Sequence, residues 1–339
     1  MEVRGRIFSL QLEHPFGIAR WSHSVQPSLI VALSQDGHTG YGEATQNAYY
    51  DVTAGKLLDG LEKIKPFLEN YRLEHPGKLW EQLRERTGNF RFLMAAIDEA
   101  AWDLYGKMQG IRTFEHWGLN PQNVPVSSYT IGIDRIEVMR RKIREKPWPV
   151  YKIKLGTGHD EDIIAALRKE TDAVFRIDAN AAWTPEKTLR MARMMRDMNV
   201  EFIEQPLPAG AWKDMRRLRE LSPLPLIADE SCRTEADLEN CRDAFHGINV
   251  KLTKAGGLTP GYRMLRWARE KGLQTMVGCM TESSVGISAA AQVAPLCRFA
   301  DLDGPLLITN DPARGVEITP QGITYSQVAG NGVEMMDSL

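Results

Sequence analysis

A regular alternation of short β-type segments and amphipathic segments runs through the chain from Val126 onward. Strands are expected at residues 124–132, 150–156, 174–180, 200–206, 224–231, 247–254, 273–280 and 298–304, and stretches with helical periodicity lie between most of them. Anchor residues near the strand ends recur every 21 to 29 positions, at Thr130, Lys154, Asp178, Glu204, Asp229, Lys251, Met280 and Asp301. A period of one strand and one helix predicts a closed parallel (β/α) barrel.

The first 121 residues have a different pattern. Residues 6–16 and 27–45 read as antiparallel strands with a turn at 35–40, and residues 53–71, 77–83 and 91–110 read as helices. We therefore predict an α+β domain at 1–121 and a barrel domain at 122–311, with a boundary near the Pro, Gly and Asn cluster at 118–125. The tail, residues 312–339, is expected to form a hairpin and to return to the first domain.

Composition excludes several classes of partner. The 339 residues include 42 Lys and Arg against 44 Asp and Glu, and a net charge of -2 offers no general attraction to nucleic acid or to a membrane. No apolar run approaches the ~20 residues of a membrane helix, and the N-terminus lacks the apolar core of a signal peptide. The four cysteines show no CxxC spacing, which indicates a reducing compartment. We expect a cytoplasmic protein that recognises a small molecule.

Three acidic anchors fall on consecutive strands of the expected barrel. Asp178, Glu204 and Asp229 each lie toward the C-terminal end of a strand, the rim that carries the active site in this fold. Three unpaired carboxylates side by side would repel one another, and a hard divalent cation removes that conflict. The set predicts one Mg²⁺ ion, because carboxylate oxygens are its preferred protein ligands. Pairing with Lys or Arg without a metal is the alternative.

Lysines flank the three carboxylates on both sides. Lys152 and Lys154 share one face of the strand at 150–156, and Lys251 ends a later strand beyond the acidic set. An edge strand with solvated lysines is the alternative. The strand–helix repeat of a barrel instead indicates that this face of the strand points into the barrel mouth. Burial and a neighbouring cation are expected to lower the pKa of these lysines toward neutrality, where a lysine can act as a base.

The ordered set resembles the enolase superfamily, and within it the muconate-lactonizing-enzyme-like subgroup. The matching residues are "KIK" at 152–154, "DAN" at 178–180, "EQP" at 204–206, "ADES" at 228–231, "NVKLTKAGG" at 249–257, "GYGEA" at 40–44 and "AAWDLYGK" at 100–107. The resemblance covers nearly the whole chain. It implies an α/β protein, a modified (β/α)7β TIM barrel with an N-terminal α+β capping domain.

Two further motifs resemble dipeptide epimerases of this superfamily. "FADLDGP" at 299–305 implies that Asp301 and Asp303 meet the α-ammonium group of a dipeptide, although "DGP" also favours a turn. "GIAR" at 17–20 implies that Arg20 pairs with a glutamyl side-chain carboxylate, as in L-Ala-D/L-Glu epimerases; a solvated loop arginine is the alternative. Thr130 and Met280 are expected to line the same site. The resemblance then implies L-Ala-D-Glu from cell-wall peptide, another acidic dipeptide or a related ligand as the substrate.

The charges predict a proton-transfer mechanism. Removing a proton α to a carboxylate places a second negative charge on that group, which a bound metal stabilises as an enediolate. Lys154 and Lys251, on opposite faces of the substrate, would act as base and conjugate acid and so invert the α-carbon of the C-terminal residue. Lys152 is expected in a supporting role. Lys254 falls off the face of Lys251 by strand alternation and is expected to be structural or peripheral.

Other functions use the same ligands and lysines. These functions are muconate cycloisomerisation, o-succinylbenzoate synthesis and N-acylamino acid racemisation. Their substrates lack the ammonium group that Asp301 and Asp303 would meet. A hydrophobic dipeptide would keep both aspartates but leave Arg20 without a partner. A catalytically inert metal-binding barrel is the alternative outside enzymes. The sequence leaves the oligomeric state open, a homo-oligomer included.

Overall fold

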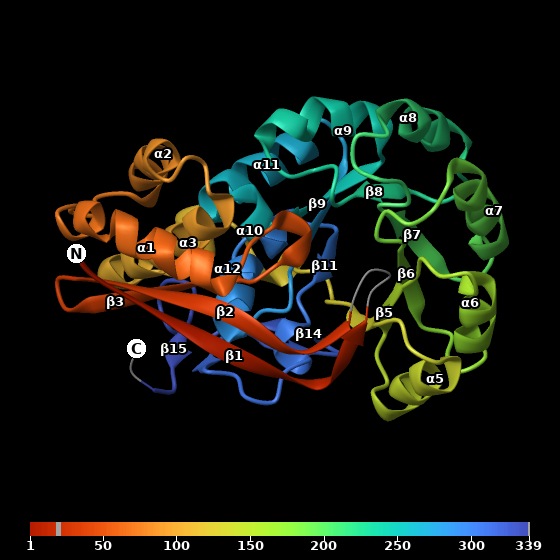
Figure 1. The fold of residues 1–339 in the computed structure, drawn as a ribbon, viewed down its shortest axis with the longest axis horizontal. Coiled ribbons are helices and arrows are strands. Elements are labelled where there is room, and N and C mark those ends of the chain that lie inside the picture. Colours follow the sequence, from red (N-terminus) through yellow and green to blue (C-terminus); the bar gives the residue numbers. More distant parts are fainter. Residues whose placement is uncertain (18–21, 338–339) are drawn as a thin grey trace.

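A computed structural model describes residues 1–17 and 22–337, so Arg20 lies outside the described residues. Two sheets dominate these residues, one antiparallel with three strands and one parallel with eight (Figure 1). None of the helices in the described part of the chain is long and apolar enough to cross a membrane.

The N-terminal part consists of the antiparallel sheet and three helices packed on it. The strands are β1 (Glu2–Gly17), β2 (Ser22–Gln35) and β3 (His38–Thr45), and the helices are α1 (Ala54–Glu69), α2 (Pro76–Arg86) and α3 (Arg91–Gln109). Asp36 and Gly37 form the β2–β3 turn with φ values of 51° and 80°, which suit an Asp-Gly hairpin. The predicted strands, turn and helices of this region are all present.

Two glycines of "GYGEA" let β3 lie directly on α3. A Cβ atom on Gly42 would come within 2.1 Å of the Ala96 carbonyl oxygen, and one on Gly40 within 2.2 Å of the Leu104 nitrogen. Helix α3 is buried on nearly all sides, since it packs between this sheet and the barrel.

The parallel sheet runs from β4 to β11 in consecutive order. Its strands are β4 (Tyr129–Ile131), β5 (Val150–Lys154), β6 (Val174–Asp178), β7 (Val200–Glu204), β8 (Leu226–Ala228), β9 (Gly247–Lys251), β10 (Gln274–Gly278) and β11 (Phe299–Asp301). The helices outside it are α5 (Ile136–Glu145), α6 (Asp160–Arg168), α7 (Pro185–Met195), α8 (Trp212–Leu221), α9 (Leu238–Ala244), α11 (Leu258–Glu270) and α12 (Ser284–Ala291).

The sheet closes on itself beside its first strand. Ser127, just before β4, forms a parallel bridge with Ala300 of β11, and the N–H of Ser128 donates to the Ala300 carbonyl at 3.0 Å. The last strand leads into a short 3-10 turn, η5 (Gly304–Leu306), instead of a helix. Seven strand–helix units followed by a final strand confirm the predicted (β/α)7β barrel.

Shorter elements connect these units. They are α4 (Thr113–His116) and α10 (Leu252–Ala255), the 3-10 turns η1 (Ala48–Tyr50), η2 (Pro121–Asn123), η3 (Glu235–Asp237) and η4 (Ala294–Leu296), and the tail strands β12 (Ala313–Arg314), β13 (Glu317–Thr319), β14 (Gly322–Thr324) and β15 (Glu334–Met335). Strands β13 and β14 pair as a hairpin. Further along the tail, the Val333 carbonyl accepts a hydrogen bond from Lys107 of α3 at 2.9 Å. The division at residue 121 stays a prediction.

Buried polar contacts join the N-terminal part to the barrel. Glu43 of β3 accepts hydrogen bonds from the N–H groups of Ser283 and Gly286 at the start of α12. Asp98 of α3 accepts from the N–H and hydroxyl of Thr259 at the start of α11, both at 2.7 Å. The paired strands β1 and β2 also extend to the barrel, where Leu12 bridges Ile308 (Figure 1). This seam holds the N-terminal part over the C-terminal ends of the strands.

Candidate active site

The three predicted metal ligands lie together at the C-terminal rim of the barrel. Asp178 and Glu204 are the last residues of β6 and β7 and are register partners, and Asp229 directly follows β8. All three are buried, and one oxygen of each lies within 4.8 Å of the others. Three converging carboxylates on adjacent strands fit a hard divalent cation, with remaining positions for water or substrate oxygens. The donor set therefore suits Mg²⁺.

Lysines neutralise these carboxylates within the protein. Burial alone would raise the pKa of Asp229, but Lys251 and Lys254 hold it well below its ordinary value. Glu204 behaves in the opposite way, since burial and the charge of Asp178 raise its pKa. A cation between the carboxylates would compete with the lysines for the same oxygens.

Lys152 lies at the centre of the acidic groups. Its ammonium is 2.8 Å from Glu204, 2.8 Å from Asp301 and 3.2 Å from Asp178, and its side chain is 1 % exposed. Burial would lower its pKa, yet these carboxylates together raise it well above the ordinary lysine value. An ammonium held permanently charged fits the predicted supporting role, because it can offset acidic charge but cannot readily give up its proton.

Lys154 and Lys251 face the cavity from opposite sides of the barrel rim. Lys154 ends β5 and lies 2.7 Å from Asp178, and Lys251 ends β9 and lies 2.8 Å from Asp229. In a closed barrel of eight strands in consecutive order, β5 and β9 are four strands apart and so lie diametrically opposite. The carboxylates of β6, β7 and β8 lie along the arc between them.

Among the protein's own groups, the pKa of Lys251 is raised. Burial lowers the pKa of Lys251, but the nearby carboxylates, Asp229 first among them, outweigh burial and raise it above the ordinary value. The lowered lysine pKa expected beside a bound metal ion stays a prediction.

Of the two roles expected for Lys254, structural or peripheral, its contacts fit the structural one. Its ammonium donates to the Oδ1 and the carbonyl oxygen of Asp229, both at 2.5 Å, and the residue is 1 % exposed. Alternation fails here because β9 ends at Lys251 and α10 begins at Leu252, so the chain turns back toward the rim.

Asp301 and Asp303 also reach the site, each with a partner. Asp301 ends β11 and accepts hydrogen bonds from Lys152 and from the Ser128 hydroxyl, both at 2.8 Å. Asp303 accepts from the Thr130 N–H at 2.6 Å. Burial and the charge of Asp301 raise the pKa of Asp303 to about 7. Both aspartates line the cavity, as do Thr130 and Met280.

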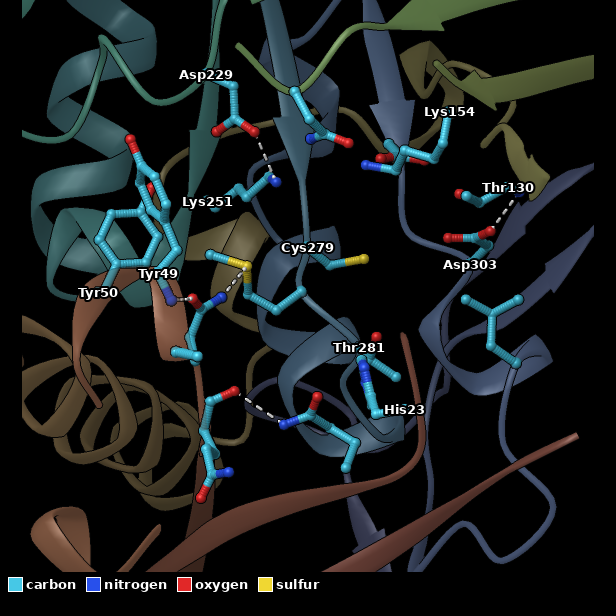
Figure 2. A pocket seen from close by; sticks show the side chains of 18 of the residues that line it. His23, Tyr49, Tyr50, Thr130, Lys154, Asp229, Lys251, Cys279, Thr281 and Asp303 are labelled. Carbon is cyan, nitrogen blue, oxygen red and sulfur yellow. Dashed lines mark hydrogen bonds and ion pairs between the residues drawn. The ribbon is translucent and has the colours of Figure 1, made fainter. Parts of the chain in front are cut away.

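The cavity of about 370 Å³ lies between the two parts of the chain (Figure 2). The barrel residues that line it are Thr130, Lys154, Asn180, Asp229, Glu230, Lys251, Cys279, Met280, Thr281, Asp301 and Asp303. The opposite wall comes from β2 and the segment after β3, with His23, Val25, Gln26, Pro27, Gln46, Asn47, Ala48, Tyr49 and Tyr50. Leu307 completes the lining. A space of this size suits a small ligand.

Several lining residues were not singled out from the sequence. His23 is half-buried and faces the cavity (Figure 2). Glu230 and Asn180 follow metal-ligand positions, and that adjacency is the signal that could have identified them. Tyr49 and Tyr50, in the short turn η1, also line the cavity.

Known families match both parts of the chain. Residues 3–115 match the family described as mandelate racemase / muconate lactonizing enzyme, N-terminal domain, and residues 134–337 match the enolase C-terminal domain-like family. The second match alone spans more than half of the chain. This protein belongs to the enolase superfamily. The predicted family is thereby confirmed.

Relatives within the superfamily align over nearly the full length. An L-Ala-D/L-amino acid epimerase from Maribacter sp. is 47 % identical, with 99 % of each chain covered. An L-Ala-D/L-Glu epimerase from Bacteroides thetaiotaomicron is 37 % identical, covering 96 % of this chain and 86 % of that one. A dipeptide epimerase from Methylococcus capsulatus, solved with Mg and L-Arg-D-Lys, superimposes with a TM-score of 0.91 at 29 % identity, covering 98 % of each chain.

Proposed function

We propose that the protein is a Mg²⁺-dependent dipeptide epimerase. It inverts the α-carbon of the C-terminal residue in dipeptides that begin with L-alanine, L-Ala-L-Glu among them. The observation that carries the proposal is the placement of Lys154 and Lys251 on opposite strands of the barrel, with three carboxylates along the arc between them. A substrate α-carbon held between the two ammonium groups can lose a proton to one side and gain one from the other.

Each protein group has a separate task in this reaction. Asp178, Glu204 and Asp229 would hold Mg²⁺, which supplies charge stabilisation for the substrate carboxylate. Lys154 or Lys251, in its neutral form, takes the α-proton, and the other, as ammonium, returns a proton to the opposite face. The reaction is reversible, because each lysine leaves the cycle in the form that the other had at its start.

The acidic pair at the end of the barrel supports a dipeptide over other superfamily substrates. Asp301 is engaged by Lys152, whereas Asp303 accepts from the N–H and hydroxyl of Thr130 and, among the described residues, pairs with no ammonium group. An ammonium group is the natural partner for this buried acidic corner. N-acylamino acids and muconate carry no ammonium at that end and would leave Asp303 without a cation.

The relatives named above support a dipeptide substrate. Their names do not restrict the second residue of that dipeptide to one amino acid. The more similar of the two relatives above is named for L-Ala-D/L-amino acid dipeptides, and the other for L-Ala-D/L-Glu. The described wall opposite the lysines is built from neutral groups such as Val25, Gln26 and Asn47. Arg20 in contact with a glutamyl carboxylate stays a prediction of the sequence.

Proton exchange measured by ¹H NMR tests the proposal directly. Protein with Mg²⁺ in D₂O is offered L-Ala-L-Glu, L-Ala-L-Leu, N-succinyl amino acids and muconate, and the C-terminal α-proton signal is followed. We expect that signal to vanish as the L,D diastereomer forms for both Ala dipeptides. Exchange confined to the N-succinyl compounds would replace the dipeptide assignment, and no exchange with any compound would contradict an epimerase.

A further inference from the structure

Asp229 uses its two carboxylate oxygens in different ways. Oδ1 accepts from the ammonium of Lys254 at 2.5 Å, and Oδ2 lies 2.8 Å from the ammonium of Lys251. Lys251 faces the cavity, whereas Lys254 does not line it and also holds the Asp229 carbonyl oxygen at 2.5 Å. Oδ1 is therefore held by a buried lysine that makes two contacts with Asp229. Oδ2 becomes available to the cavity when Lys251 moves away.

The carboxylates of Asp178 and Glu204 also have one oxygen that accepts from an N–H group and one that faces a lysine. The backbone N–H of Asn180 donates to Oδ1 of Asp178 at 2.9 Å, and Nδ2 of Asn249 donates to Oε1 of Glu204 at 2.7 Å. The second oxygen of each carboxylate faces an ammonium of β5, at 2.7 Å for Asp178 and 2.8 Å for Glu204. All three side chains thus present one oxygen and keep the other occupied.

We propose that Lys254 is a positioning residue that makes Asp229 a one-oxygen ligand and thereby favours Mg²⁺ over Ca²⁺ at this site. The proposal rests on the Mg²⁺ site of the proposed function. Mg²⁺ is small and demands six ligands in near-ideal octahedral geometry. Ca²⁺ takes six to eight oxygens and readily accepts both oxygens of one carboxylate. Holding Oδ1 of Asp229 denies the larger ion its bidentate contact.

Lys254 is the group suited to this task, and Lys251 is not. A lysine that transfers protons must leave Asp229 when substrate and metal are in place. Lys254 is held in α10 by its two contacts with Asp229 and is almost fully buried, so it stays paired while Lys251 is released. Second contacts of this kind typically change metal affinity 10- to 100-fold when removed.

The ratio of two metal affinities tests the proposal. Isothermal titration calorimetry gives Kd for Mg²⁺ and for Ca²⁺ with the unsubstituted protein and with Lys254→Met. Both ions carry two charges, so the loss of one positive charge alters both affinities by a similar factor and cancels in the ratio. We expect the ratio to shift about tenfold toward Ca²⁺ in Lys254→Met, and to stay within about threefold in Lys254→Arg, which keeps a donor.

A matched control separates positioning from general damage. Lys107 of α3 forms a comparable pair with the buried Asp103 of the same helix at 2.8 Å, and neither residue contacts the three metal ligands. Lys107→Met should lower the melting temperature without changing the Mg²⁺ to Ca²⁺ ratio. An unchanged ratio in folded Lys254→Met would overturn the proposal.

A crystal structure of the unsubstituted protein with Mg²⁺ decides the matter if Lys254→Met does not fold. We expect Lys254 to remain on Oδ1 of Asp229, with the ion on Oδ2 alone. An ion bound to both oxygens, or Lys254 displaced from Asp229, would overturn the proposal. Failure of the unsubstituted protein to bind Mg²⁺ at all would instead overturn the proposed function, and this inference with it.

Discussion

At the scale of single residues, the two opposed lysines give the sharpest prediction. Lys154→Ala and Lys251→Ala should each lower epimerisation by about 10² to 10⁴, because each removes one proton-transfer group. The remaining lysine still faces one side of the α-carbon. Each variant should therefore exchange the α-proton of one diastereomer with D₂O, and the two variants should prefer opposite diastereomers. ¹H NMR on L,L and L,D substrates separately checks this, and a shared preference would contradict opposed placement.

Asp303 predicts a pH dependence of substrate binding. Burial and the ionised Asp301 raise its pKa to about 7, with Lys152 and Thr130 acting in the other direction. Only the carboxylate form pairs with an ammonium, so KM should rise about fivefold to tenfold between pH 7.5 and pH 6. In Asp303→Asn the KM should be high and flat over this range. A KM profile of the unsubstituted enzyme that matches the variant would exclude Asp303 from binding.

Site residues at the ends of strands could be predicted from the sequence, whereas a site residue in the turn after a strand could not. Asp178, Glu204 and Lys154 end their strands, so position in the barrel period was enough to bring them together. Lys254 reaches Asp229 through the turn into α10, and alternation along a strand cannot describe a residue beyond the end of that strand.

At the scale of elements, the contact between β3 and α3 depends on the absence of a side chain. Gly42→Ala would place a Cβ atom 2.1 Å from the Ala96 carbonyl and 2.6 Å from the Ala100 nitrogen, both rigid backbone atoms. We expect a loss of roughly 3 kcal/mol or more in the free energy of unfolding, measured by urea denaturation. Gly55→Ala in α1, where the nearest atom is 3.9 Å away, should change it by less than about 1 kcal/mol.

Helix α12 shows why some elements could not be read from periodicity. All eight of its residues are buried, and its sequence "SVGISAAA" has no polar face. A helix packed on every side carries no 3.6-residue alternation of polar and apolar positions, so the periodicity gives no signal. The amphipathic helices α7 and α11 bury one face only, and the sequence indicated both.

At the scale of the whole molecule, the seam between the two parts gathers buried acidic groups. Glu282 lies at the end of the β10–α12 connection, and burial together with Glu43 of β3 raises its pKa to about 8. Between its ordinary value of 4.5 and 8 the folded protein holds a proton that the unfolded chain has lost. This contribution to stability is complete below pH 4.5 and is lost as the pH rises through 8.

The free energy of unfolding should therefore fall between pH 6 and pH 8. One such group contributes a loss of about 1 to 3 kcal/mol over this interval, at ~1.4 kcal/mol per pH unit. Glu282→Gln mimics the protonated side chain and keeps an acceptor for the Met280 N–H, so its loss should be smaller. Urea denaturation at both pH values checks this. The exposed Glu239→Gln should behave like the unsubstituted protein, and equal slopes for all three would contradict the assignment.

The barrel could be predicted as a whole because its strand–helix repeat occurs in one continuous stretch of the sequence. The wall that faces it could not, because it depends on how far the paired strands β1 and β2 extend from the N-terminal part before β1 meets residues 307–309. How far these strands extend toward the barrel is set by tertiary packing between distant segments. The local sequence pattern does not predict it.

The separate origins of the two cavity walls have a consequence for how this protein can change. The groups proposed to move protons come from the barrel strands, and the wall opposite them comes from β2 and the segment after β3. Mutations in residues 23–27 and 46–50 can alter which side chain is accepted without touching the proton-transfer groups. A library confined to these ten positions would explore new substrates while the reaction itself is inherited intact, and natural selection has had the same freedom.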